Sequence, residues 1–98
     1  MNMQQMLIQA QKMQREMQKK QAELEAQEFT VTKGGAVTAV VKGDKSIVSV
    51  SIDKDALDPD NKEMVEELIA LAINEAVEQI KTAEAAISES VTGNGPLF

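Results

Sequence analysis

Apolar residues in the first quarter of the chain follow a seven-residue repeat. They fall on two tracks: Met3, Ala10, Met17 and Leu24, and beside them Met6 and Met13. The alternating spacing of three and four residues is typical of the narrow seam of a coiled coil. The same stretch has no Gly or Pro and consists largely of Gln, Met, Lys, Glu and Ala, which are good helix formers. The pattern predicts one long helix within residues 1–27.

The middle of the chain alternates apolar and polar residues in three short runs. The runs are Phe29 to Thr32, Val37 to Lys42 and Ile47 to Asp53. A period of two predicts β-strands with one buried and one solvated face, so each run is expected to be half buried. Gly34 and Gly35 separate the first two runs, and a short segment beginning at Gly43 separates the last two. Residues 28–53 are therefore predicted to form a three-stranded antiparallel β-meander.

A second long helix is predicted over residues 59–91. Asp58 can accept hydrogen bonds from free amides as its N-cap, and Pro59 suits the first helical position because its missing N–H costs nothing there. Apolar residues recur with helical spacing from Val65 onward. Two glycines and Pro96 follow, so residues 92–98 are expected to be a flexible tail. The predicted fold class is α+β.

The predicted elements are too long for one compact body. The two helices would measure ~37 Å and ~48 Å at 1.5 Å per residue. A compact domain of this size has a radius of gyration near 13 Å, hence a diameter of ~32 Å. Three short strands with one apolar face also cannot cover both helices along their lengths. A second copy of the chain is the simplest cover, which predicts a homodimer with two-fold symmetry.

Composition narrows the possible chemistry. The 98 residues are expected to form a single domain, and they contain no His, Cys, Trp or Tyr. Thiolate and imidazole catalysis, disulfides and Cys/His zinc sites are excluded, and we expect no enzymatic activity, no cofactor, no metal and no small-molecule substrate. Asp53, Asp55, Asp58 and Asp60 could offer oxygens to Ca²⁺, but they lack the EF-hand spacing and are interpreted as cap and turn residues.

The absence of cysteine and the polar first residues indicate a cytoplasmic protein. The longest apolar run, Leu68 to Ile73, is six residues long. A membrane span requires about 20 such residues. No membrane partner is expected.

Charge is divided unevenly along the chain. The net charge is −6, yet residues 1–22 carry +3 and residues 53–98 carry −8. Lys12, Arg15 and Lys19 follow each other at i, i+3 and i+7, on the side of the first helix opposite the apolar seam. We call these three residues the cationic stripe. A row of cations on one helix face can bind the phosphates of DNA. The alternative is an ordinary solvated helix face, with Glu16 and Glu23 interspersed among the cations.

Glutamines run beside the cationic stripe. Gln4, Gln11 and Gln18 repeat every seven residues. Glutamine can pair with adenine in the major groove, although it is also a common neutral residue on helix surfaces. Lys20 lies on the seam itself, where it is expected to set register or extend toward solvent rather than to contact DNA.

Several local sequences resemble one known family. They are Leu7 to Gln14 in the first helix, Gly34 to Val37, Val50 to Asp53, Leu57 to Pro59, Leu68 to Ala76, and the final Pro96-Leu97-Phe98. In order and spacing they resemble the YbaB/EbfC family of small bacterial nucleoid-associated DNA-binding proteins. The resemblance implies a helix, three-stranded sheet and helix in each protomer, an intertwined, tweezer-shaped homodimer, and DNA contact by the protruding helices. Members often carry Lys or Arg late in the final helix, whereas here Lys81 stands against Glu84 and Glu89.

These observations favour a bacterial cytoplasmic homodimer, located at the nucleoid, that binds double-stranded DNA with little sequence specificity. Its role would be nucleoid organisation or gene regulation, with Lys12, Arg15 and Lys19 as the DNA-binding residues. The alternative is a non-enzymatic interaction module that docks a replication or repair partner through its helices.

Overall fold

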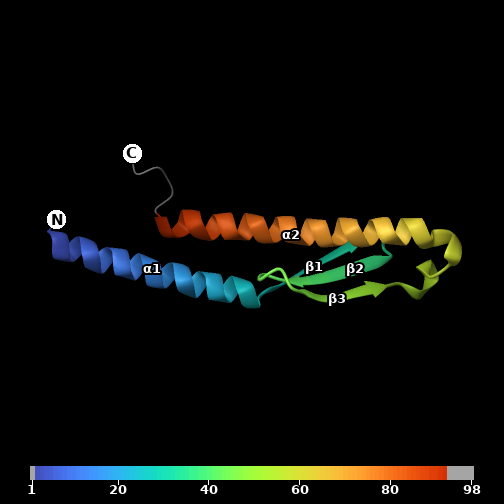
Figure 1. Ribbon diagram of the computed structural model, residues 1–98, viewed down its shortest axis with the longest axis horizontal. Helices are drawn as coiled ribbons and strands as arrows, with labels where there is room; N and C mark the ends of the chain where they lie inside the picture. Colours follow the sequence, from blue (N-terminus) through green and yellow to red (C-terminus); the bar gives the residue numbers. More distant parts are fainter. Residues whose placement is uncertain (1, 93–98) are drawn as a thin grey trace.

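The computed structural model describes residues 2–92 and has the element order that the sequence predicts (Figure 1). The elements are α1 (Met3–Ala26), β1 (Glu28–Lys33), β2 (Val37–Lys42), β3 (Ile47–Ile52), two 3₁₀ turns, η1 (Lys54–Ala56) and η2 (Pro59–Asn61), and α2 (Lys62–Thr92). The predicted α+β class is confirmed. The tail expected over residues 92–98 lies, apart from Thr92, outside the described residues.

The three strands form an antiparallel meander in the order β1-β2-β3. Val31 pairs with Ala39 between β1 and β2, and Ala39 pairs with Val50 between β2 and β3. The register shifts between Val40 and Val41, where a bulge interrupts the ladder with β3. Gly34 and Gly35, with φ of 60° and 63°, make the first turn, as their position between two strands predicts.

The core lies between α2 and the first two strands. Its buried members are Val31, Val37, Ala39, Val41, Ala72, Ala76 and Ile80. These residues come from one face of the sheet and from one side of α2, where helical spacing brings them into a single row. The long apolar pattern of the last helix therefore covers β1 and β2.

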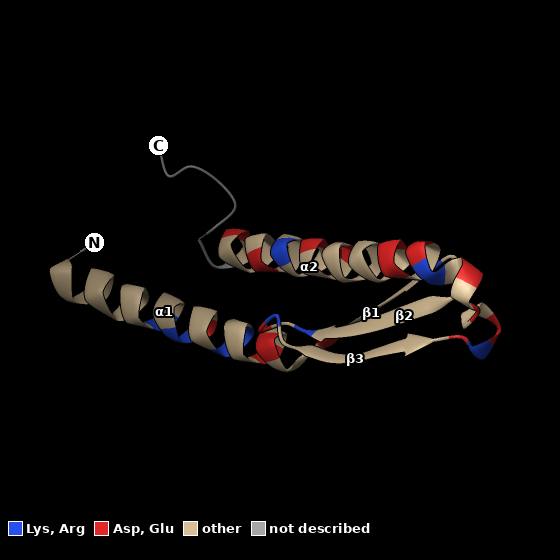
Figure 2. Cartoon of the chain, turned by 45° about the vertical axis from the view of Figure 1, so that its right-hand side comes forward, with Lys and Arg blue, Asp and Glu red and all other residues tan. Residues whose placement is uncertain are grey.

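β3 differs from its sequence prediction. Ile47, Val48 and Val50 are 54%, 48% and 38% exposed, so within one chain the strand is not half buried as expected. The physical reason is that α2 packs over the other two strands, and β3 lies farthest from it in both views (Figures 1 and 2). Val50 pairs with the buried Ala39, so its side chain is on the α2-facing side of the sheet but lies beyond the helix.

The entry into α2 also differs in detail from the prediction. The Asp58 carboxylate accepts a hydrogen bond from the Asp60 amide at 2.8 Å, and Pro59 occupies the first position, but the turn they begin is the 3₁₀ turn η2. The α-helix itself starts at Lys62. The cap residues are as predicted, and the helix begins one turn later.

The molecule is strongly elongated. Its principal extents are 69 × 25 × 14 Å and its radius of gyration is 19.5 Å, against ~13 Å for a compact domain of similar length. α1 extends from one end of the sheet and runs alongside the C-terminal half of α2 (Figure 1).

Candidate nucleic-acid interface

Helix α1 carries three of its four cations on the side that faces solvent. Its first turn is capped by Asn2, whose side chain accepts a hydrogen bond from the Gln5 amide at 2.8 Å. Lys12, Arg15 and Lys19 are all exposed, and helical spacing places them within about 60° of one another around the axis. In Figure 2 the basic residues of α1 lie between its middle and its end at the sheet. The structure thus brings all three predicted site residues onto one free face.

The opposite side of α1 faces the protein. Leu24 is buried and Met13 and Met17 are half buried. The Lys20 ammonium donates a hydrogen bond to the Ser90 hydroxyl at 3.0 Å, which ties α1 to the C-terminal part of α2. Lys20 is therefore part of the contact between the helices, in keeping with its predicted place on the seam. Met3, at the far end of the seam, is 84% exposed.

The cations of the stripe form no ion pair within the described part of the chain. Four other lysines form ion pairs: Lys33 with Glu75, Lys45 with Glu84, Lys62 with Glu66 and Lys81 with Glu78. Among the side chains of residues 2–90, Lys12, Arg15 and Lys19 make no ion pair or hydrogen bond. Most of the acidic residues lie on α2 and in the loop before it (Figure 2). The stripe is thus exposed and lies apart from the carboxylates of α2, with Glu16 and Glu23 of α1 exposed four residues after Lys12 and Lys19.

The dimensions of the stripe suit a phosphate backbone. From Lys12 to Lys19 it extends ~10 Å along the helix axis, at 1.5 Å per residue. A DNA strand rises ~3.4 Å per phosphate, so the same length of duplex axis presents about three phosphates on one strand. Gln4, Gln11 and Gln18 are exposed along one edge of the stripe. Ile8, which the sequence patterns did not single out, is exposed on the same face, four residues before Lys12.

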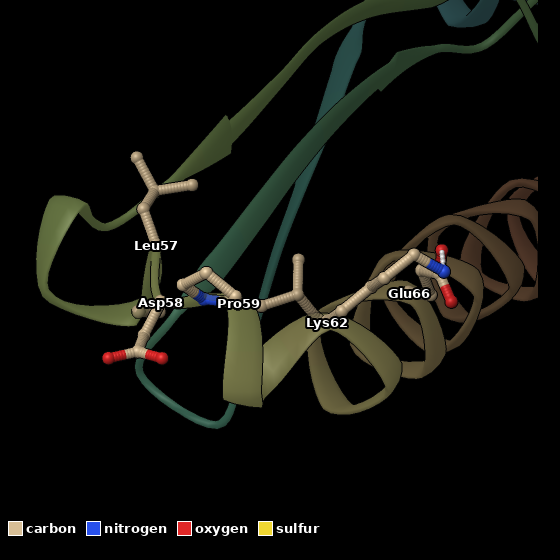
Figure 3. Close-up of a pocket in the computed structure, with 7 residues that line it drawn as sticks. Leu57, Asp58, Pro59, Lys62 and Glu66 are labelled. Atoms are coloured by element: carbon tan, nitrogen blue, oxygen red, sulfur yellow. Dashed lines mark ion pairs between the residues drawn. The ribbon is translucent and has the colours of Figure 1, made fainter.

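A shallow pocket at the opposite end of the molecule offers different chemistry (Figure 3). It has a volume of about 330 Å³ and is lined mainly by apolar atoms of the loop before α2 and of its first turns. Its charged groups are already engaged: Lys62 pairs with Glu66 at 3.0 Å, and Asp58 caps the turn at Asp60. Its two carboxylates, both exposed, thus take part in an ion pair and in a cap.

Two of the aspartates before α2 accept hydrogen bonds from backbone amides. The Asp53 carboxylate accepts a hydrogen bond from the Asp55 amide at 3.0 Å, the same arrangement as that of Asp58 with Asp60. Within residues 2–92 no three acidic side chains gather as metal ligands would. The interpretation of Asp53 and Asp58 as cap residues is confirmed.

Neither long helix of the described chain has an apolar stretch sufficient to cross a bilayer.

Comparison with known proteins settles the family. The model of the YbaB/EbfC DNA-binding family matches residues 1–95, nearly the whole chain. The chain belongs to this family. The resemblance seen in the local sequences is thereby confirmed.

Relatives of known name support the same assignment. A nucleoid-associated protein of Clostridium kluyveri is 42% identical over 93 residues, which cover 94% of this chain and 82% of that protein. One from Clostridium novyi is 48% identical over 86% of this chain and 72% of its own length. The crystal structure of an uncharacterized Helicobacter pylori protein has the same fold, with a TM-score of 0.77 at 19% identity over 95% of this chain and 99% of that one.

Proposed function

We propose that this protein binds double-stranded DNA at the bacterial nucleoid, as a homodimer and with little sequence specificity. The observation that carries the proposal is the cationic stripe, three exposed cations in one row on α1 that form no ion pair with the side chains of residues 2–90. The names of the family and of its members point in the same direction. Contacts to phosphates fix a protein on a duplex without reading its sequence, which accounts for the low specificity.

The surface that one chain leaves uncovered supports the homodimer. β3 is an edge strand without a charged residue, and Ile47, Val48 and Val50 expose their apolar side chains. Proteins seldom leave such an edge open, because it pairs readily with other strands. A second copy placed on the α2-facing side of β3 would cover these residues and complete the core. Two-fold symmetry then supplies a second α1, so that two cationic stripes hold one duplex as a clamp.

The clamp uses the outer faces of the two α1 helices. Close to the sheet, the space between α1 and α2 of one chain is occupied by Leu24 and by the contact of Lys20 with Ser90, so DNA is not expected to enter there. α2 is excluded as the main contact because Lys81 already pairs with Glu78 and lies among further carboxylates. With no enzymatic group required, the protein acts by binding alone in nucleoid organisation or gene regulation.

Gel retardation of unrelated duplexes tests the proposal. The purified protein should retard duplexes of different sequence with similar affinity at low salt, and an excess of unrelated DNA should compete effectively. Failure to retard any duplex at low salt would contradict the proposal. The protein-interaction module would then be the better account, with the pocket near Leu57 and the face of β3 as its docking surfaces.

A further inference from the structure

Ile8 stands out on the face of α1 that carries the cationic stripe. Gln4, Ile8, Gln11 and Arg15 follow at i, i+4, i+7 and i+11, so helical spacing places them in one row. Ile8 is 57% exposed and is the single apolar residue of that row. Lys12 lies one turn further along the helix and flanks the row. An apolar group is thus placed between amides and cations on the surface proposed to meet DNA.

Neither helix propensity nor packing in the chain explains this residue. Ile8 is the only β-branched residue of α1, and β-branched side chains form helices less readily than the Met, Leu and Gln around it. The seam that packs toward α2 lies on the other side of the helix, with Met13 and Met17. Ile8 therefore contributes little to the fold while exposing apolar surface.

The residue types of the row match the major-groove edge of an A·T pair. The major groove is wide enough to admit an α-helix, and there the thymine base presents its 5-methyl group. Apolar side chains contact that methyl, and Gln can pair with the adenine of the same base pair. With Lys12 and Lys19 on phosphates at the rim of the groove, Gln4, Ile8 and Gln11 would face the base edges.

We propose that Ile8 contacts the 5-methyl group of thymine in the major groove and so gives the protein a preference for A·T base pairs. The inference rests on the proposed DNA binding and adds a modest base preference to it. Removing one buried methyl group should weaken binding about threefold per contact. That factor is far below the ~10³-fold or more that separates specific from non-specific binding, so it is compatible with low overall specificity.

Replacement of thymine by deoxyuridine in the DNA probe tests the contact directly. Deoxyuridine lacks only the 5-methyl group and keeps both the base pairing and the phosphates. Binding is measured by fluorescence anisotropy, at about 50 mM salt, to a short duplex of alternating A·T pairs and to its deoxyuridine counterpart. The unaltered protein should prefer the thymine duplex about threefold per contacted methyl, and up to about tenfold if both α1 helices of the dimer engage.

Ile8→Ala and Leu7→Ala form a matched pair of variants. Leu7 is 58% exposed, nearly the same as Ile8, but points about 100° away around the helix. Ile8→Ala should bind the deoxyuridine duplex as the parent does and lose the preference for thymine, whereas Leu7→Ala should keep the preference. Both changes favour helix formation, so folding is not at risk.

The outcomes separate this inference from the proposed function. If the parent binds neither duplex, the proposed function fails. If it binds both equally, DNA binding stands and the thymine contact is wrong. A preference that survives in Ile8→Ala would mean that another group contacts the methyl. A change from dimer to monomer in Ile8→Ala, with the preference unchanged, would assign Ile8 to a protein contact and overturn the inference.

Discussion

Gly43 approaches the backbone of Leu24 so closely that no side chain fits between them. A Cβ atom at Gly43 would lie 1.8 Å from the Leu24 carbonyl oxygen, and the Gly43 amide donates a hydrogen bond to the Gln27 carbonyl at 2.9 Å. The turn between β2 and β3 is thereby held against the end of α1. This contact sets where α1 leaves the sheet and hence where its cationic stripe lies.

Gly43→Ala should destabilise the protein. The added methyl group meets backbone, which cannot move aside as a flexible side chain can, so we expect a loss of about 1–3 kcal/mol. Chemical denaturation, monitored by circular dichroism, measures the loss.

Gly35→Ala is the comparison for that measurement. A Cβ at Gly35 meets nothing within 4 Å, but the φ of 63° is unfavourable for alanine and should cost about 1 kcal/mol. Gly43→Ala is therefore expected to be the more damaging of the two. The reverse order would show that the turn and α1 are not in contact as described.

Local patterns were sufficient to predict the order and type of the elements. Period-two alternation located the three strands, and the pair Gly34 and Gly35 marked the first turn because only a residue without a side chain adopts positive φ freely. Helical spacing also predicted that Lys12 and Lys19 share an exposed face with Arg15, since that depends only on the geometry of α1. These features are set by residues close in sequence.

Features that depend on distant residues were not predictable. Gly43 could be recognised as a turn residue, but its close approach to Leu24 arises from the way two elements meet in space. Alternation in β3 suggested a half-buried strand, yet it cannot show how much of the sheet α2 covers, and Val50 is left exposed beside the buried Ala39. Exposure of Ile8 likewise depends on where α1 leaves the sheet.

Val50→Asp should disrupt the proposed dimer. The substitution places a charge on the α2-facing side of β3, where we expect a second copy to bury it, and an unpaired buried charge costs several kcal/mol. Light scattering should return about twice the chain mass of 10.7 kDa for the parent and a lower mass, or loss of folding, for the variant.

Ser51→Asp provides the matched control. Ser51 is also exposed on β3 but pairs with Thr38, on the opposite side of the sheet from Val50. This variant should remain dimeric. A monomeric parent at micromolar concentration would remove the argument for the dimer, and loss of the dimer in Ser51→Asp alone would place the interface on the other face.

The pKa of Asp44 should depend on Ser46. The Ser46 hydroxyl and backbone amide donate hydrogen bonds to the Asp44 carboxylate, and these bonds lower its pKa below the usual value. The pKa of Asp44 is thus lower in the folded protein than in the unfolded chain. The hydrogen bonds therefore stabilise the turn at pH values above the usual carboxyl pKa, and this stabilisation is lost as the pH falls through the lowered pKa. Ser46→Ala keeps the amide and removes the hydroxyl, so the pKa should rise part of the way to normal. Carboxyl chemical shifts across an acid titration measure it, and an unchanged pKa would contradict the assignment.

The salt dependence of DNA binding tests the central claim most directly. If about four of the six stripe cations of a dimer engage phosphates, log K should fall with log salt at a slope near −3.6, or ~150-fold weaker binding at 200 mM than at 50 mM salt. A triple variant combines Lys12→Gln, Arg15→Gln and Lys19→Gln, which keep the helix but remove the charge. This variant should fold and dimerise normally while losing affinity for every duplex. Lys81→Gln, which removes a cation already paired with Glu78, should change little. A triple variant that binds DNA with the affinity and salt slope of the parent would show that the stripe is only a solvated face.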